Sequence, residues 1–264
     1  MTALYIIIAI LFFGLLVGIH ELGHFLTAKA CGIRVEEFSI GLGPAIFKKQ
    51  KGETTYSLRA VPFGGYCAMT GENEESDDPR AFSSQKLWKK LIVLFAGSFM
   101  NFLLGFILIF ILVEAWNDAP LWPVLRHSFE ICIEFVKLVW QGIAMLFNGQ
   151  AGISDLSGPV GIVDVMVQTA EQAETTTYAI SDLTYLGAFI AVNLAVMNLL
   201  PIPALDGGRI FLLLVTAVIE AVTGKKLNKK YEAYIHGAGM VLLLLLMAYV
   251  MFHDVWRLIF GIQP

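Results

Sequence analysis

Three residues near the N-terminus, His20, Glu21 and His24, have the types and spacing needed for metal-assisted hydrolysis. Positions i and i+4 of an α-helix share one face, so the two imidazoles would point the same way as nitrogen ligands. Glu21 lies about 100° around the helix from His20, close to such a metal without having to bind it. A general base needs this position. The spacing therefore predicts two metal ligands and one base on a single helix.

The segment that carries these residues is strongly apolar. Every residue from Ala3 to Ile19 is apolar or glycine, which predicts a membrane-spanning helix. A charged group at the middle of a bilayer costs roughly 2.5–3.5 kcal/mol on insertion scales, so such groups usually have a function. His-Glu-x-x-His on a helix is the signature of zinc-dependent proteases. The alternative is a set of polar anchors at the membrane interface, which explains a single histidine better than this combination.

A catalytic zinc site usually has three protein ligands, so the third must come from elsewhere in the chain. Asp206 is the sole carboxylate between Asp182 and Glu220, and it follows Pro201 and Pro203 in a segment that should unwind a helix. At membrane depth, such backbone is tolerated only where it is buried in protein or lines a polar cavity. Asp206 would complete a His₂Asp zinc site, or would alternatively N-cap the following helix. The HExxH pattern favours the ligand.

Other polar residues in apolar surroundings are candidates for supporting roles. Asn101 could hydrogen-bond a ligating histidine or a neighbouring helix. Asn198 lies at the same break as Asp206 and could bind the substrate backbone or stabilise an oxyanion. The acidic run from Glu72 to Asp78 is expected to be a solvated turn. Near the ends of apolar segments, where we expect interface residues, stand the remaining histidines: His127, His236 and His253.

The composition is that of an integral membrane protein. Of the 264 residues, 57% are hydrophobic and only 15% are charged, with a mean hydropathy of +0.70. The net charge of −4 gives no support to nucleic-acid binding. The N-terminal segment has no charged n-region and no cleavage site, so we expect it to stay in the mature protein. Without any CxxC pair, we expect no disulfides among the cysteines Cys31, Cys67 and Cys132.

The elements that position these residues are mainly helices. We expect an all-α polytopic membrane protein forming one domain over residues 1–264, with about four transmembrane helices at 3–26, 91–113, 184–205 and 234–253. Ten of the eighteen lysines and arginines lie between the first two spans. This bias predicts that the first and third loops are cytoplasmic and that both termini lie outside. A polar stripe predicts an interfacial amphipathic helix at 124–147, or a helix that faces other protein.

The first loop contains a predicted β structure. Residues 53–61 are rich in β-branched and aromatic side chains, and Pro62 and Gly64–Gly65 should end this strand in a turn. A second break is expected at Gly41–Pro44. We therefore predict a small membrane-associated β-hairpin or sheet within residues 33–70.

Taken together, these motifs resemble those of the site-2 protease family of intramembrane zinc metalloproteases, in particular its bacterial RseP/RasP group. The resemblance covers almost the whole chain, and the matching motifs occur in the family's order: His20–His24, Phe38–Pro44, Arg59–Tyr66, Ser98–Phe102, Ser157–Gly161 and Asn198–Gly207. It implies one Zn²⁺ per chain held by His20, His24 and Asp206, with Glu21 activating the water.

The resemblance also implies a substrate class and a way of binding it. Substrates of the group are single-span membrane proteins, such as anti-sigma factors and remnant signal peptides, cleaved in or near the bilayer during regulated intramembrane proteolysis. The location implied is the bacterial cytoplasmic (inner) membrane. The hairpin Glu53–Val61 would pair with the unwound substrate by strand addition. The residues of that hairpin expected to bind substrate are Tyr56, Leu58, Arg59 and Val61.

The chain departs from the group's pattern in one place. Members usually carry one or two PDZ domains between the second span and the outer helix, where only residues 114–123 form a short linker here. Two alternatives therefore stay open. One is the sporulation-type branch, which lacks PDZ domains and cuts pro-sigma factors. The other is a zinc-binding membrane scaffold or transporter, which would not need Glu21.

Overall fold

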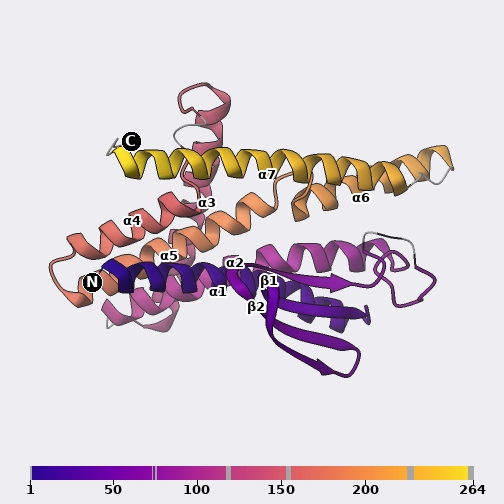
Figure 1. Cartoon of the computed structure of the whole chain (residues 1–264), viewed down its shortest axis with the longest axis horizontal. Coiled ribbons are helices and arrows are strands. Elements are labelled where there is room, and N and C mark those ends of the chain that lie inside the picture. Colours follow the sequence, from indigo (N-terminus) through magenta and orange to yellow (C-terminus); the bar gives the residue numbers. More distant parts are fainter. Residues whose placement is uncertain are drawn as a thin grey trace. The chain divides into compact units, whose positions relative to one another are not determined.

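The computed structural model describes residues 2–72, 74, 76–116, 120–152, 156–224 and 229–260. These residues form seven helices and two strands (Figure 1). In chain order the elements are α1 (Thr2–Ala30), β1 (Val35–Lys51), β2 (Thr54–Met69), α2 (Leu87–Trp116), α3 (Leu121–Phe147), α4 (Pro159–Gln172), α5 (Thr176–Asn198), α6 (Asp206–Thr223) and α7 (Lys229–Phe260).

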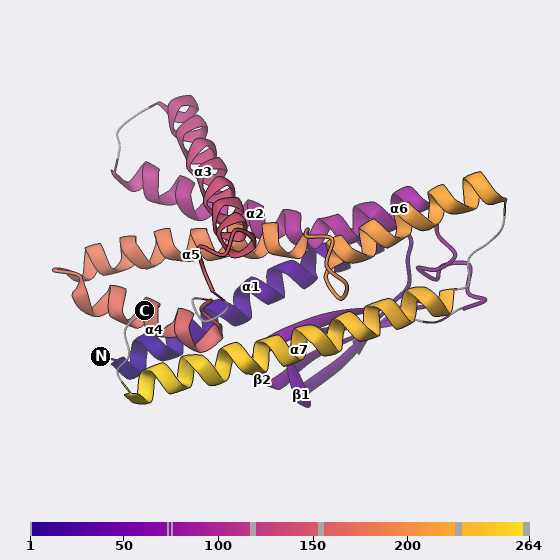
Figure 2. The ribbon, with the colours of Figure 1, turned by 90° about the horizontal axis from the view of Figure 1, so that it is seen from above.

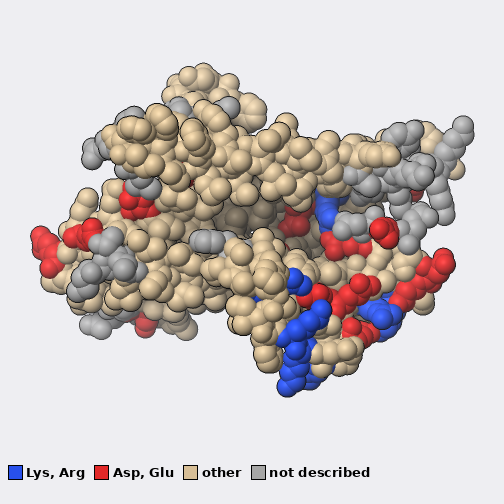
Figure 3. Space-filling model, viewed as in Figure 1, with Lys and Arg blue, Asp and Glu red and all other residues tan. Residues whose placement is uncertain are grey.

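Four of the described helices are long and apolar enough to span a bilayer: Leu4–Ala30, Leu87–Glu114, Thr176–Asn198 and Tyr234–Arg257. The expected fold class, a helical membrane protein with a small sheet after its first helix, is thus confirmed. On the face drawn in Figure 3, Lys and Arg atoms gather over the sheet and the segment that follows it. The described cysteines are free, as predicted.

The third span differs from its predicted range of 184–205. α5 begins at Thr176 and ends at Asn198. The backbone N–H of Tyr178 donates to Oγ1 of Thr175 (3.3 Å), which satisfies a donor at the start of the helix. Pro201 and Pro203 have no N–H to continue the helical ladder, so the chain between α5 and α6 is irregular.

The chain divides into two compact units. The first contains residues 1–10, 102–196 and 241–264. Within it, Cys132 and Phe135 of α3 pack against Ile109 of α2 and against Ala188 and Val192 of α5. Part of the apolar surface of α3 therefore packs on protein, and its position in the membrane interface stays a prediction. The helix α4 was not predicted; it begins with Pro159, which is favoured at a first position, and it lies beside α5 (Figures 1 and 2).

The second unit contains residues 11–101 and 197–240. Its core joins α1, α2 and the sheet and includes the buried side chains Ala28, Ile33, Val35, Cys67, Met69, Phe82, Val93 and Leu94. All of the residues predicted to bind zinc or to act on water belong to this unit. The hydrophobic core thus holds the C-terminal part of α1, which carries His20 and His24, in place against α2.

The sheet in the second unit is formed by long, bent strands. β1 and β2 pair antiparallel, and β1 bends at Gly41 and Gly43, whose φ angles of +86° and +81° favour glycine. Because both strands bend, the first part of β1 pairs with both ends of β2: Phe38 faces Tyr56 and also Cys67. The prediction that the strand ends at Pro62 is wrong, since β2 continues to Met69.

Candidate active site

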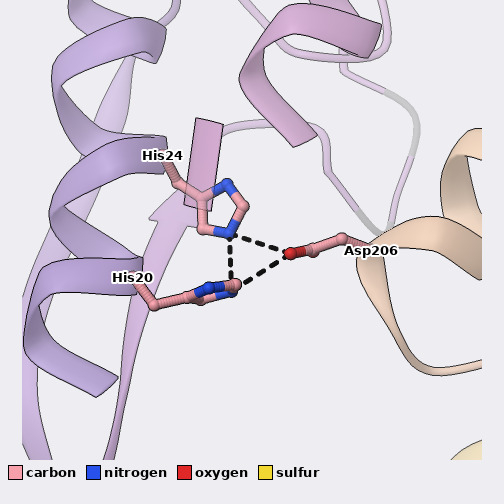
Figure 4. A group of neighbouring side chains, drawn as sticks. All are labelled: His20, His24 and Asp206. Carbon is pink, nitrogen blue, oxygen red and sulfur yellow. Dashed lines mark hydrogen bonds and ion pairs between the residues drawn. The ribbon is translucent and has the colours of Figure 1, made fainter. Parts of the chain in front are cut away.

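His20 and His24 lie on one face of α1, as the spacing predicts, and both are buried. Asp206 faces them from the first position of α6 (Figure 4). Oδ2 of Asp206 lies 3.1 Å from Nε2 of His20 and 3.2 Å from Nε2 of His24. The two Nε2 atoms are 3.1 Å apart. Three candidate ligand atoms from distant parts of the chain therefore form a nearly equilateral triangle.

This triangle fits one face of a zinc coordination tetrahedron. With zinc–ligand distances of about 2.0–2.1 Å, neighbouring ligand atoms of a tetrahedral site stand about 3.3 Å apart. Oδ2 of Asp206 is buried and has no hydrogen-bond partner among the described groups. A buried carboxylate oxygen without a proton donor is costly, and a cation between the three atoms removes that cost. The residues present therefore fit a zinc ion.

The ring of His24 is oriented by a group behind it. Its Nδ1 lies 2.8 Å from the carbonyl oxygen of Val93 in α2, which can only accept a hydrogen bond. Nδ1 therefore carries the proton, and Nε2 of the neutral ring presents its lone pair to Asp206. A backbone carbonyl behind a ligating histidine is the usual arrangement in metal sites.

Asn101 stands behind His20, where the sequence predicts a supporting amide. Its Nδ2 lies 3.4 Å from Nδ1 of His20, and its Oδ1 is buried without a partner in the described structure. Turning the amide by 180° would place Oδ1 opposite Nδ1 of His20 and satisfy both groups. The tautomer that this arrangement favours again leaves Nε2 free to bind a metal.

Two glycines that sequence reasoning missed make room for the histidines. A Cβ atom at Gly97 of α2 would lie under 3.0 Å from Nε2 of His24 and from Cε1 of His20. A Cβ at Gly23 would lie under 3.0 Å from the carbonyl oxygen of Ala96. α1 and α2 thus approach each other closely at the site. The only local signal was the run of small residues around Gly97.

Asp206 was alternatively predicted to N-cap the following helix, and it does not. The N-cap of α6 is Leu205, and no side-chain capping hydrogen bond is present. Cβ atoms at Gly207 and Gly208 would each collide with carbonyl oxygens of the preceding loop, those of Leu199 and Ile202. The carboxylate of Asp206 is therefore free to face the two imidazoles instead of the start of its own helix.

Glu21 is half-buried and lies beside the sheet. A Cβ at Gly65 would stand 3.4 Å from Cγ of Glu21, so β2 passes directly against the predicted base. From Gly65 to Met69, β2 pairs with β1 on one side, and the described residues supply no strand on its other side. An open strand edge therefore begins next to Glu21.

The predicted substrate-binding stretch has a different environment. Tyr56 pairs with both Phe38 and Lys49, and Leu58 pairs with both Ile40 and Phe47. Because the backbone here has neighbours on both sides, it offers no free edge to a substrate strand, and the role of Tyr56 and Leu58 in substrate binding stays a prediction.

The other two residues of the predicted substrate-binding set are occupied within the sheet. Val61 pairs with Leu42. Arg59 donates hydrogen bonds to the carboxylate of Glu37, to Oγ of Ser39 and to the carbonyl oxygen of Gly43.

Asn198 ends α5, at the break before Asp206 where the sequence places it, and its role in binding substrate or an oxyanion stays a prediction. Two further residues make contacts within the protein that their predicted positions did not include. Glu72, expected in a solvated turn, forms an ion pair with Arg209 of α6. His236, expected at the interface, accepts a hydrogen bond from the backbone N–H of Ala204 (3.2 Å).

Comparison with known proteins identifies the family of this chain. Residues 8–246 match peptidase family M50. The chain belongs to this family. The M50 chain is 30% identical to a Fusobacterium nucleatum protein named as a "putative zinc metalloprotease", over 96% of this chain and 98% of the relative. It is 24% identical to the regulator of sigma-W protease RasP of Bacillus subtilis, over 96% of this chain and 98% of that relative.

Membership in M50 makes this protein a multi-pass membrane protease that uses zinc and acts in regulated intramembrane proteolysis. The alignment with the Fusobacterium relative spans 345 positions, more than the 264 residues of this chain. That relative therefore has residues without a counterpart here. The absence of PDZ domains between α2 and α3 stays a prediction, and residues 117–119 of the linker lie outside the described residues.

Proposed function

We propose that His20, His24 and Asp206 bind one Zn²⁺ and that Glu21 is the general base in hydrolysis of a peptide bond. The observation that carries this proposal is the triangle of ligand atoms 3.1–3.2 Å apart around a buried, unpartnered carboxylate oxygen. Zinc in such a site lowers the pKa of its water and polarises the substrate carbonyl. Glu21 accepts the proton of the attacking water and delivers it to the leaving amide nitrogen.

The substrates we propose are single-span membrane proteins, including anti-sigma factors and remnant signal peptides, in the bacterial cytoplasmic membrane. The name of the Bacillus subtilis relative, which refers to a sigma factor, supports this class. The basic residues around the sheet favour a cytoplasmic position for it, with both termini outside.

We further propose that the substrate lies extended along the open edge Gly65–Met69. The peptide bonds of a membrane helix are shielded by their own hydrogen bonds, so a bond must leave the helix before water can attack it. A free strand edge offers replacement partners for the backbone groups that unwinding exposes. This edge begins beside Glu21, which would bring the unwound bond to the base.

The roles of the site residues are tested with purified protein and a tagged single-span substrate. We expect the parent to cleave and to contain about one zinc per chain. Glu21→Gln should keep the zinc and lose cleavage, because it removes the base and no ligand, whereas Asp206→Ala should lose both. Zinc-loaded Glu21→Gln that cleaves at the parental rate would exclude Glu21 as the base. Unchanged zinc content in Asp206→Ala would exclude Asp206 as a ligand.

The binding edge is tested by placing a photo-crosslinking amino acid at Ala68, with a matched variant at Ile46. Ile46 is exposed and lies in the part of β1 that forms the opposite edge of the sheet. In the Glu21→Gln background, which should retain uncleaved substrate, we expect crosslinks from position 68 and few from position 46. The reverse pattern would show that the substrate pairs with the other edge.

A further inference from the structure

The loop that presents Asp206 contains an unusual backbone conformation. Ala204, two residues before Asp206, has a φ of +80° and is the only described non-glycine residue with positive φ. A Cβ atom makes this conformation unfavourable, so it persists only where surrounding contacts hold it. The loop between α5 and α6 must therefore be held from outside.

The contact that holds this conformation comes from His236 on α7. Its Nδ1 accepts a hydrogen bond from the backbone N–H of Ala204 (3.2 Å), and both residues belong to the second unit. Among the described residues, His236 is the only one whose side chain hydrogen-bonds to residues 199–205. Since Nδ1 accepts, the proton of the neutral ring is on Nε2.

A second contact on the same helix reaches the same loop. Gly239 follows His236 by three residues and so shares its face of α7. A Cβ atom at Gly239 would lie under 3.0 Å from Cβ and from the carbonyl oxygen of Pro203. Gly237, on another face, would meet nothing within 4 Å. α7 therefore touches two successive loop residues, by a hydrogen bond and by close backbone packing.

These two contacts lie immediately before the proposed third zinc ligand. Metal–ligand distances tolerate deviations of only about 0.2 Å, so a small displacement of the loop would take Oδ2 of Asp206 out of range. We propose that His236 is a positioning residue for the metal centre: its Nδ1 holds Ala204, and thereby Asp206, in the ligating geometry, with Gly239 providing the close approach. This inference rests on the proposed zinc site.

The hydrogen bond is tested with three substitutions at one position. His236→Phe keeps a ring and removes the acceptor. His236→Asn places an amide oxygen near the position of Nδ1, whereas His236→Gln places it near that of Nε2. Zinc affinity is measured by competition with a chelator, and the ligand geometry by the visible spectrum of the cobalt-substituted protein. We expect His236→Phe and His236→Gln to lose about 10–100-fold in zinc affinity, with an altered cobalt spectrum. His236→Asn should recover most of the zinc affinity and most of the parental cobalt spectrum.

The close approach is tested by a matched pair of glycines in α7. Gly239→Ala should weaken zinc binding, because its methyl group displaces Pro203, whereas Gly237→Ala should bind zinc like the parent. Both changes raise helix propensity equally, so the comparison isolates the contact. Equal zinc affinity in the two alanine variants, or a parental cobalt spectrum in His236→Phe, would overturn the proposal. If a His236 variant does not fold, the comparison of Gly239→Ala with Gly237→Ala still tests whether contact between α7 and the loop supports zinc binding.

The same measurements separate this proposal from the zinc site itself. If Asp206→Ala binds zinc as tightly as the parent, Asp206 is not a ligand and the proposed site fails. If Asp206→Ala loses zinc while His236→Phe and Gly239→Ala retain it, the zinc site stands and only the role of α7 is excluded.

Discussion

At the scale of single residues, the proposed zinc site depends on an absent side chain as much as on the proposed ligands. The position where a Cβ of Gly97 would stand is already filled by imidazole atoms of His20 and His24. The surrounding helices are closely packed, so a Cβ there would have to displace one of these imidazoles.

Gly97→Ala should therefore weaken zinc binding by more than a hundredfold, a loss of about 3 kcal/mol or more. Gly142→Ala is the matched control, because a Cβ at that helical glycine meets nothing within 4 Å. Zinc affinity by chelator competition measures both variants. Parental affinity in Gly97→Ala would show that the histidines do not need this space.

The carboxylate of Glu37 in β1 accepts hydrogen bonds from two side chains of β2. Partial burial would raise the pKa of Glu37, but hydrogen bonds from Ser57 (2.7 Å) and Arg59 (2.8 Å) and the charge of Arg59 lower it to about 2. A folded-state pKa below the ordinary 4.5 means that the ionised carboxylate stabilises the fold.

The stabilisation of the folded state by ionised Glu37 should be complete above pH 4.5. It should decrease as the pH falls from there to about 2. Thermal unfolding of the parent and of Glu37→Gln across this range measures it. We expect the parent to unfold at a higher temperature than Glu37→Gln by a constant difference near neutral pH, and we expect this difference to decrease in acid. An advantage that grows on acidification would contradict the assignment.

At the scale of elements, a buried carboxylate joins two helices of the first unit. Oδ2 of Asp254 in α7 accepts the backbone N–H groups of Gly158 and Gly161 at the start of α4, each at 2.9 Å. The first turn of a helix has N–H groups without intrahelical partners, and Asp254 satisfies two of them.

Asp254→Ala should destabilise the protein by roughly 1–3 kcal/mol for each buried N–H that loses its partner. Asp254→Asn should lose less, since its amide oxygen can still accept. The midpoint of thermal unfolding measures the effect, with the exposed Asp182→Ala as control. A midpoint for Asp254→Ala equal to that of Asp182→Ala would mean that water replaces the carboxylate.

At the scale of the whole molecule, zinc binding and folding are coupled. The proposed ligands come from α1 and α6, which are far apart in the sequence, so an unfolded chain does not present them together. A ligand that binds only the folded state stabilises it by about 4 kcal/mol at a thousand times its Kd.

Removal of zinc by a chelator should therefore lower the midpoint of thermal unfolding, on the order of ten degrees for a chain of this size. Glu21→Gln should show the same decrease, because it keeps the ligands. Asp206→Ala should show none, because it binds no zinc before chelation. A decrease of equal size in Asp206→Ala would mean that the chelator acts elsewhere.

The sequence by itself determined the features that depend on local periodicity. The helical repeat places His20 and His24 on one face, long apolar runs predict the four spans, and two prolines predict the break before Asp206. Each of these signals lies within one segment, where backbone geometry and hydropathy decide the outcome. Local patterns were therefore enough to propose all three ligands, although Asp206 suits an N-cap as well as a metal site.

Only the tertiary structure decided which segments meet. It showed that residues 55–58 are paired on both sides and that Gly65–Met69 is the edge of the described sheet next to Glu21, because strand pairing depends on how β1 and β2 bend. It also brought Gly97 against the imidazoles and His236 against Ala204. These contacts join residues far apart in the chain, and a single glycine or histidine has no periodic pattern. The close packing of the fold alone gives such residues their roles.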